Sequence, residues 1–286
     1  MNRDRKFVIL RSRMVGACIL CVVLAAAFLL SGRSKTVPDL SSRSVESARI
    51  LFAGTKDDAD CVIVLNGDVC VMIDSGEEQD AEHILALLRR EGVEEIACLI
   101  LTHPDKDHIG GAPTLLENFP IQKIVVPDYD QPKDSYDVLL EQAEELEISV
   151  LTLEEREELC YKELSLSIWP PEETYYDKDN NYSLAVLAEY GEVKMFFAGD
   201  AQKKRMKELL QYNLPQVDLY KVSYHGRNLT SGVKLIDIIR PQYAVVTAAA
   251  PGKEIELALT SVDAQIVCTR GQDALFVSDG KEIWLE

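Results

Sequence analysis

The sequence of 286 residues carries 30 lysines and arginines against 48 aspartates and glutamates, a formal net charge of −18. This acidic balance argues against a dedicated nucleic-acid scaffold, because phosphate backbones are held mainly by clustered Lys and Arg. The hydrophobic share of 47% excludes a disordered acidic tail. The chain is long enough to bury a sizeable core.

The first 30 residues differ in charge from the rest. They carry +4, which leaves −22 for the remainder. Between Arg13 and Arg33 lie 19 uncharged residues, which as a helix would reach about 28 Å, close to the hydrocarbon thickness of a bilayer. By the positive-inside rule we expect a cytoplasmic N-terminus over 1–13, a transmembrane signal anchor over 14–32 and the bulk of the chain outside the cell. A signal peptide cleaved near 25–27, a lipoprotein cut before Cys18 and a buried core helix are the alternatives.

Residues 33–48 are polar and Ser-rich, as in a short linker, and we expect one domain over 49–286. The domain opens with predicted strands at 61–65 and 69–73. They flank Asn66-Gly67, which favours a two-residue hairpin. A helix over 78–91 and a buried strand over 96–102 follow.

The later part of the chain repeats this pattern of strands followed by alternating helices and strands. The predicted strands lie at 124–126, 148–153, 163–169, 183–190, 193–199, 217–223, 242–247, 265–268, 274–278 and 282–285, and the helices at 134–147, 201–212 and 231–239. This order predicts an α/β fold in which two mixed sheets pack face to face with helices outside.

The loop after the predicted strand 96–102 is rich in metal-ligand side chains. His103 and His108, two of only four histidines, enclose Asp105 and Asp107 in the stretch THPDKDHIGG. Imidazole and carboxylate groups are standard ligands for zinc, manganese or iron. A solvated acidic loop is the alternative, but it has no need of two histidines at this spacing.

Two further polar residues follow later strands. Asp200 comes directly after the strand 193–199, and His225 comes shortly after the strand 217–223. Asp200 alone could be the N-cap of a helix. Side chains at strand ends from distant parts of a chain, however, commonly assemble a site at one edge of a sheet pair.

In these residues and the segments around them, the sequence resembles the metallo-β-lactamase family. The similar branch is the one formed by the hydrolase domain of ComEC-type DNA-uptake proteins. The matching pieces stand in family order over about 230 residues: VMIDSG at 71–76, THPDKDHIGG at 102–111, the stretch from WPPEETYY to MFFAGD at 169–200, and KVSYHG at 221–226. The resemblance implies a four-layer αββα sandwich, here preceded by the transmembrane helix, and a metal-dependent hydrolase.

The resemblance also implies two divalent metal ions, zinc foremost and manganese as the alternative. The first would be bound by His103 and Asp105, and the second by Asp107, His108 and His225. Asp200 would bridge the two, and Asp107 and Asp200 would be the catalytic carboxylates. Asp74 would hold the metal loop by hydrogen bonds.

This chain departs from the family at several positions. Many relatives have a further His ahead of the bridging Asp, where this chain offers only Asn180 and Asn181. A neutral amide is a weak ligand for zinc, so we expect the first site either to be weaker or to take an oxygen-preferring ion such as manganese. Tyr224 replaces the first His of the family's HHG, and 245–256 contain no His although the branch usually has one there.

We therefore expect a membrane-anchored hydrolase that cleaves a phosphodiester or another ester by means of a metal-activated water. The substrate would be a small molecule or a component of the cell envelope. Nucleic acid stays open but is disfavoured by charge, unless Lys106, Lys221 and Arg227 form a local positive patch. The alternative is a catalytically weakened or inactive module that binds a ligand or partner at the cell surface.

Overall fold

The computed structural model describes residues 47–286. The Asn66-Gly67 pair turns the chain between two antiparallel strands, as predicted, and Gly67 takes a φ of +61° that favours glycine. This hairpin lies inside an eight-stranded sheet of order β15-β14-β1-β2-β3-β4-β5-β6. Its strands are β1 (Ala48–Phe52), β2 (Val62–Asn66), β3 (Val69–Ile73), β4 (Cys98–Ile100), β5 (Lys123–Pro127), β6 (Ser149–Leu153), β14 (Ala274–Ser278) and β15 (Ile283–Leu285).

The second sheet has seven strands in the order β13-β12-β11-β10-β9-β8-β7. In both sheets antiparallel pairs give way to parallel pairs along the chain, because helical crossovers take over from hairpins. The first sheet then ends with two further antiparallel strands, β14 beside β1 and β15 beside β14. The strands are β7 (Glu157–Tyr161), β8 (Leu164–Trp169), β9 (Ala185–Tyr190), β10 (Val193–Phe197), β11 (Leu219–Lys221), β12 (Tyr243–Val246) and β13 (Gln265–Cys268).

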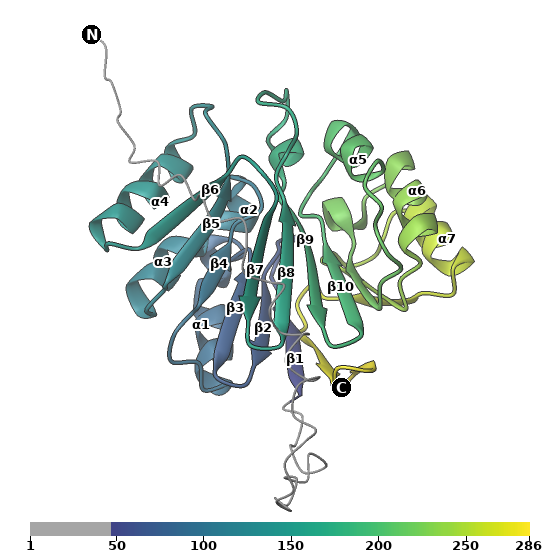
Figure 1. The fold of residues 1–286 in the computed structure, drawn as a ribbon, viewed down its shortest axis with the longest axis horizontal. Helices are drawn as coiled ribbons and strands as arrows, with labels where there is room; N and C mark the ends of the chain where they lie inside the picture. The colour runs from purple at the N-terminus through teal and green to yellow at the C-terminus, as the bar shows by residue number, and fades with distance from the viewer. Residues whose placement is uncertain (1–46) are drawn as a thin grey trace, which may run out of the picture. The chain divides into compact units, whose positions relative to one another are not determined.

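Helices cover the outer face of each sheet, which gives four layers (Figure 1). The apolar faces of α1 (Ala81–Arg90), α3 (Ala112–Asn118) and α4 (Asp134–Glu145) pack on the first sheet. Those of α5 (Lys203–Leu209), α6 (Thr230–Ile239) and α7 (Lys253–Ser261) pack on the second. Between the sheets lies a third apolar layer, in which Phe52 contacts Phe197 and Phe276.

Short helical turns stand beside the strand ends that carry the predicted site. They are η2 (Glu78–Asp80) after β3, α2 (Lys106–Ile109) after β4, η3 (Asp179–Tyr182) before β9, and η4 (Ser223–Gly226) after β11. Parallel strands end at the same edge of their sheet, so these turns bring side chains from distant parts of the chain together.

The predicted two-sheet α/β sandwich is confirmed. The expected cytoplasmic segment 1–13 and transmembrane helix 14–32 lie outside the described residues, as does almost all of the expected linker 33–48. Within 47–286, each helix is too short or too polar to cross a bilayer.

Candidate metal centre

Asp74 ties the end of β3 to the loop that follows β4. Its carboxylate accepts hydrogen bonds from the backbone N–H and the hydroxyl of Thr102, at 2.7 and 2.8 Å. It also lies 2.7 Å from Nδ1 of His108. These buried contacts hold both ends of the metal-ligand loop and orient the His108 ring.

Two glycines allow this loop to pack tightly on its neighbours. A Cβ on Gly111 would lie 2.1 Å from the backbone oxygen of Ser75, and one on Gly110 would lie 2.4 Å from that of Lys106. Neither backbone oxygen can move aside as a flexible side chain would. The Gly-Gly pair that ends the motif is therefore required by the close approach of main chains.

The two histidines of the loop leave Nε2 free to bind a ligand. The Thr102 hydroxyl donates to Asp74, so Nδ1 of His103, 3.2 Å from that hydroxyl oxygen, is the donor in its own contact. Nδ1 of His108 donates to Asp74. Both Nε2 atoms are buried and have no hydrogen-bond partner among residues 47–286. A buried polar atom without a partner destabilises the folded state unless something binds it. A metal ion can bind the lone pair of such an imidazole nitrogen.

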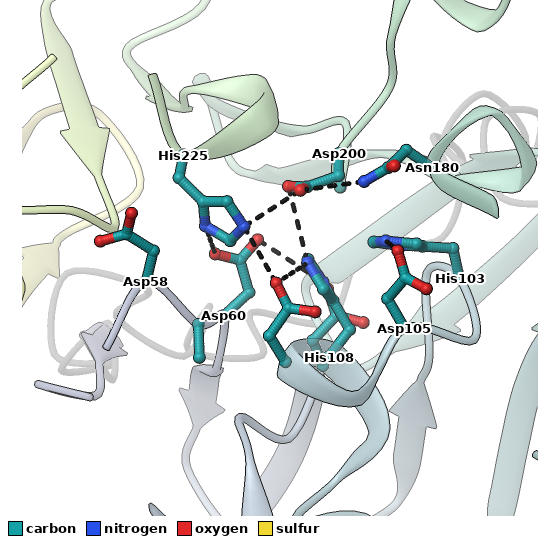
Figure 2. A network of polar contacts seen from close by, with 12 residues as sticks. Asp58, Asp60, His103, Asp105, His108, Asn180, Asp200 and His225 are labelled. Atoms are coloured by element: carbon teal, nitrogen blue, oxygen red, sulfur yellow. Dashed lines mark hydrogen bonds and ion pairs between the residues drawn. The ribbon is translucent and has the colours of Figure 1, made fainter. Parts of the chain in front are cut away.

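Four ligand-type side chains meet at this edge of the sheets, each with one ligand atom within 4.8 Å of the others: Asp107, His108, Asp200 and His225. Nε2 of His225 lies 3.0 Å from Asp200 and 3.2 Å from Asp107. Nε2 of His108 lies 3.5 Å from Asp200. Figure 2 shows His108, Asp200 and His225 pointing toward one another. Two imidazoles and two carboxylates in this volume suit zinc or manganese.

His103 and Asp105 lie beside this cluster and form a sparser group. Nε2 of His103 is 3.4 Å from Oδ2 of Asp105, and the ring centroids of His103 and His108 are 4.0 Å apart. The other oxygen of Asp105 accepts a hydrogen bond from the Lys133 ammonium. The structure thus brings all six predicted ligands to one edge, four of them closely and two more loosely.

Asp60 is a buried member of the centre that sequence reasoning missed. Its carboxylate pairs with Lys221, accepts a hydrogen bond from the Thr247 hydroxyl at 2.6 Å and lies 3.3 Å from Nδ1 of His225. Nδ1 of His225 in turn donates to Thr247 at 3.0 Å, which leaves Nε2 directed at Asp107 and Asp200. In the sequence Asp60 ends an acidic run typical of an exposed turn. Its position directly before the buried strand is the one sequence signal that could have identified it as a site residue.

Lys221 lies inside the centre rather than on its surface. Its side chain is only 2% exposed, and its ammonium contacts Asp60, Asp200 and the backbone oxygen of Gly199. Lys221 therefore adds no exposed charge to the local positive patch considered with Lys106 and Arg227. It instead compensates the buried carboxylates.

Charge coupling dominates the protonation of the cluster. Burial raises the pKa of Asp200, but His225, His108 and Lys221 outweigh it and hold that pKa well below its usual range. Burial lowers the pKa of His225, but Asp200 and Asp60 outweigh it and raise that pKa to about 10. A metal ion at His225 therefore competes with a proton.

The structure separates the remaining predicted residues. Asn180 lies at the centre, where its amide N–H donates to Asp200 at 3.2 Å while its oxygen accepts from Gln202. Asn181 instead accepts from the backbone N–H of Arg205, at the start of α5. Tyr224 packs its ring against the Arg227 guanidinium, 5.0 Å from the ring centroid.

A sequence profile described as "Metallo-beta-lactamase superfamily" matches residues 54–249. The chain belongs to the metallo-beta-lactamase superfamily. Two similar curated proteins are ComE operon protein 3 of Bacillus subtilis, 29% identical over 169 residues, and Recombination protein 2 of Haemophilus influenzae, 26% identical over 165 residues. These matches confirm the resemblance to the ComEC-type branch.

Each match covers 58% of this chain but only 21% and 19% of the two relatives, so the chain spans about a fifth of their length. Among solved structures, the metallo-beta-lactamase fold protein YhfI from Bacillus subtilis is similar, with a TM-score of 0.56 and 10% identity. That similarity covers 84% of this chain and 100% of YhfI, and at this identity it shows the fold alone. The donor set at the strand ends is of the kind that metal-binding members of the superfamily need.

Proposed function

We propose that the chain is a metal-dependent hydrolase that cleaves a phosphodiester or another ester. We further propose that residues 14–32 anchor it in the cell membrane, with the N-terminus in the cytoplasm and residues 49–286 outside. The observation that carries the hydrolase proposal is the cluster of two imidazoles and two carboxylates within 4.8 Å, with Nε2 of His108 buried and unpartnered among the described residues.

In this proposal Asp107, His108, Asp200 and His225 hold one divalent ion. His103, Asp105 and Asp200 would hold a second. Zinc is the first expectation and manganese the alternative. When bound, such ions supply Lewis acidity that acidifies a water and neutralises negative charge developing on the attacked phosphoryl or carbonyl group.

The two predicted catalytic carboxylates have different environments. The Asp107 side chain is 26% exposed, whereas that of Asp200 is 2% exposed. Asp107 can therefore accept a proton from a water that enters from solvent. Asp200 is held by Lys221 and Asn180 and serves to fix the geometry.

An arginine pair near the centre supports an anionic substrate. Arg227 and Arg270 both contact the carboxylate of Asp58, and both remain partly exposed. Asp58 lies on the same side of the centre as His225 (Figure 2). Two guanidinium groups held together in this way can bind phosphate oxygens. The net charge of −18 still favours a small phosphodiester over a long polyanion.

The test is the metal content and hydrolytic profile of the purified full-length chain after supplementation with zinc or manganese. Bis(p-nitrophenyl) phosphate, p-nitrophenyl acetate and single-stranded DNA serve as the three substrates. We expect at least one equivalent of metal and the highest kcat/KM on the phosphodiester, with Asp107→Asn lowering it about 100-fold or more. Less than one equivalent of metal together with no cleavage would overturn the proposal.

The second candidate is a module that binds a ligand without cleaving it. Asn180 favours this alternative, because its amide oxygen is bound by Gln202 and so does not replace the missing His ligand. The same preparations separate the two functions. Stoichiometric metal without turnover of any of the three substrates would support the binding module.

A further inference from the structure

Lys133 places a positive charge on one half of the metal centre. It stands directly before α4, and its ammonium binds Asp105 and, at 2.6 Å, Asp179. The hydroxyl of Tyr129 donates to the same Asp179 carboxylate at 2.9 Å. The ammonium is thus held from two sides, with 21% of the side chain exposed.

The two halves of the centre consequently differ in charge and in donors. In the close cluster, the carboxylates of Asp107 and Asp200 face two imidazoles, and with Asp60 and Asp74 beside them the ammonium of Lys221 leaves three net negative charges. In the other half, Lys133 pairs with both carboxylates that the observed contacts show there, Asp105 and Asp179, which leaves one net negative charge. Oδ2 of Asp105 still faces Nε2 of His103 at 3.4 Å, so the donors are present but their charge is partly compensated.

We propose that Lys133 makes the two halves unequal. The chain then binds one divalent cation tightly at the four-residue cluster and a second weakly at His103 and Asp105, against the charge of the ammonium. This inference shares one assumption with the proposed function, namely that these residues bind metal ions. Lys133 touches neither Asp107 nor Asp200 among its observed contacts and acts through Asp105, as a positioning residue.

The expected size of the effect follows from Coulomb's law. A unit charge a few ångströms from a divalent ion acts strongly at low dielectric, and solvent at a partly exposed side chain reduces the effect. Replacing Lys133 by a neutral side chain should therefore tighten the weaker site about tenfold or more.

The experiment is a titration of the metal-free full-length chain with Mn²⁺, in which electron paramagnetic resonance counts the free ion. The wild type should show two classes of site whose Kd values differ about tenfold or more. Lys133→Met should tighten the weaker class and leave the stronger one unchanged. Lys133→Arg keeps the charge and should behave as wild type.

Two further variants test the assignment independently. Asp105→Asn should abolish the weaker class alone. Asp179→Asn removes the negative charge of the second partner of the Lys133 ammonium, so the ammonium pairs with Asp105 alone. This variant should raise the Kd of the weaker class of site. Asp179→Asn and Lys133→Met therefore shift the same Kd in opposite directions, and Asp179→Asn still tests the charge effect if Lys133→Met does not fold.

Two equal sites in the wild type, or a weaker class that Lys133→Met leaves unchanged or loosens, would overturn the inference. Loosening would mean that Lys133 orients Asp105 for the ion instead of opposing it. Either result leaves the hydrolase proposal intact, because ions are still bound. Absence of any bound Mn²⁺ or Zn²⁺ would overturn the hydrolase proposal as well, so the two failures are distinguishable.

Discussion

Two histidines of the centre owe their orientation to the buried carboxylates of Asp74 and Asp60, which contact the Nδ1 side of each ring. Asp74 holds the His108 ring, and Asp60 acts with Thr247 on the ring of His225. Such outer contacts fix the tautomer and raise the basicity of the ligand nitrogen. At this scale the metal-ligand loop was predictable because its residue types stand at characteristic spacings. Asp60 and Lys133 were not, because they reach the centre only through contacts made by the folded chain.

Asp60→Asn should weaken metal binding about 10- to 100-fold, since the substitution removes the carboxylate that Thr247 and Lys221 bind. Competition with a chromophoric zinc chelator measures the change. Asp57→Asn, in the same acidic run but exposed, is the control and should keep wild-type affinity. Unchanged affinity in Asp60→Asn would show that Asp60 does not support the His225 ring.

Arg227→Gln should raise KM for bis(p-nitrophenyl) phosphate about three- to tenfold with little change in kcat, because a charged contact to phosphate oxygen is lost. The rate on the neutral p-nitrophenyl acetate should stay the same. Arg240→Gln, whose partner is Asp237 at the end of α6, is the control. An equal effect on both substrates would argue against a phosphate contact.

At the scale of elements, the strands with strong apolar patterns and the Asn-Gly hairpin were predictable from local sequence. The strands β1 and β7 and the helices α3 and α7 were not. In β7 (EELCY) exposed and half-buried residues alternate without a strong apolar face, and α3 (APTLLEN) is too short for a clear helical period. Their structure depends on partners elsewhere in the fold, such as β8 for β7.

Gly111→Ala should loosen the metal-ligand loop, because its Cβ would meet the backbone oxygen of Ser75 at 2.1 Å. We expect a loss of about 1–3 kcal/mol in the free energy of unfolding together with weaker metal binding. Gly232→Ala in α6 is the matched control. There the nearest atom is 3.4 Å away, and the free energy of unfolding should stay the same or rise slightly.

Arg205 joins η3 to α5 from a fully buried position. Its guanidinium donates to the backbone oxygens of Ser183 and Trp169 and to the Glu208 carboxylate, at 2.7–2.9 Å. Arg205→Met leaves that carboxylate buried without its counter-charge, although Tyr176 and the backbone N–H of Glu172 still donate to it, so the free energy of unfolding should fall by about 3–5 kcal/mol in urea titrations. Lys207→Met, on the exposed face of the same helix, should change it by less than about 0.5 kcal/mol.

At the scale of the whole molecule, the centre joins the two sheets. Asp74, Asp107 and His108 follow strands of the first sheet, and Asp200 and His225 follow strands of the second. An ion bound by both sets links the two halves of the sandwich and favours the folded state over the unfolded one. This assembly was foreseeable in outline, because the motifs follow strands in both halves of the chain.

Metal removal should therefore lower the thermal stability of the chain as a whole. With zinc at about 100 times its Kd, binding adds about 2.7 kcal/mol to the free energy of unfolding. Differential scanning fluorimetry with EDTA and with added zinc measures the shift in Tm. The double variant His108→Ala and His225→Ala should show no zinc-dependent shift. A shift that persists in it would place the stabilising ion elsewhere.

The pairing of β1 with β14 also bears on the order of events during biosynthesis. Ala48 pairs with Ser278, so the first strand described and one of the last are neighbours in one sheet. A chain emerging from a ribosome or a translocation channel can form the β2–β3 hairpin early, but β1 lacks its second neighbour until residues 274–278 have appeared. The first sheet can close only after residues 274–278 have been made, and until then one edge of β1 is open to pairing with other chains. Chains that stop before β14 should accordingly aggregate during synthesis.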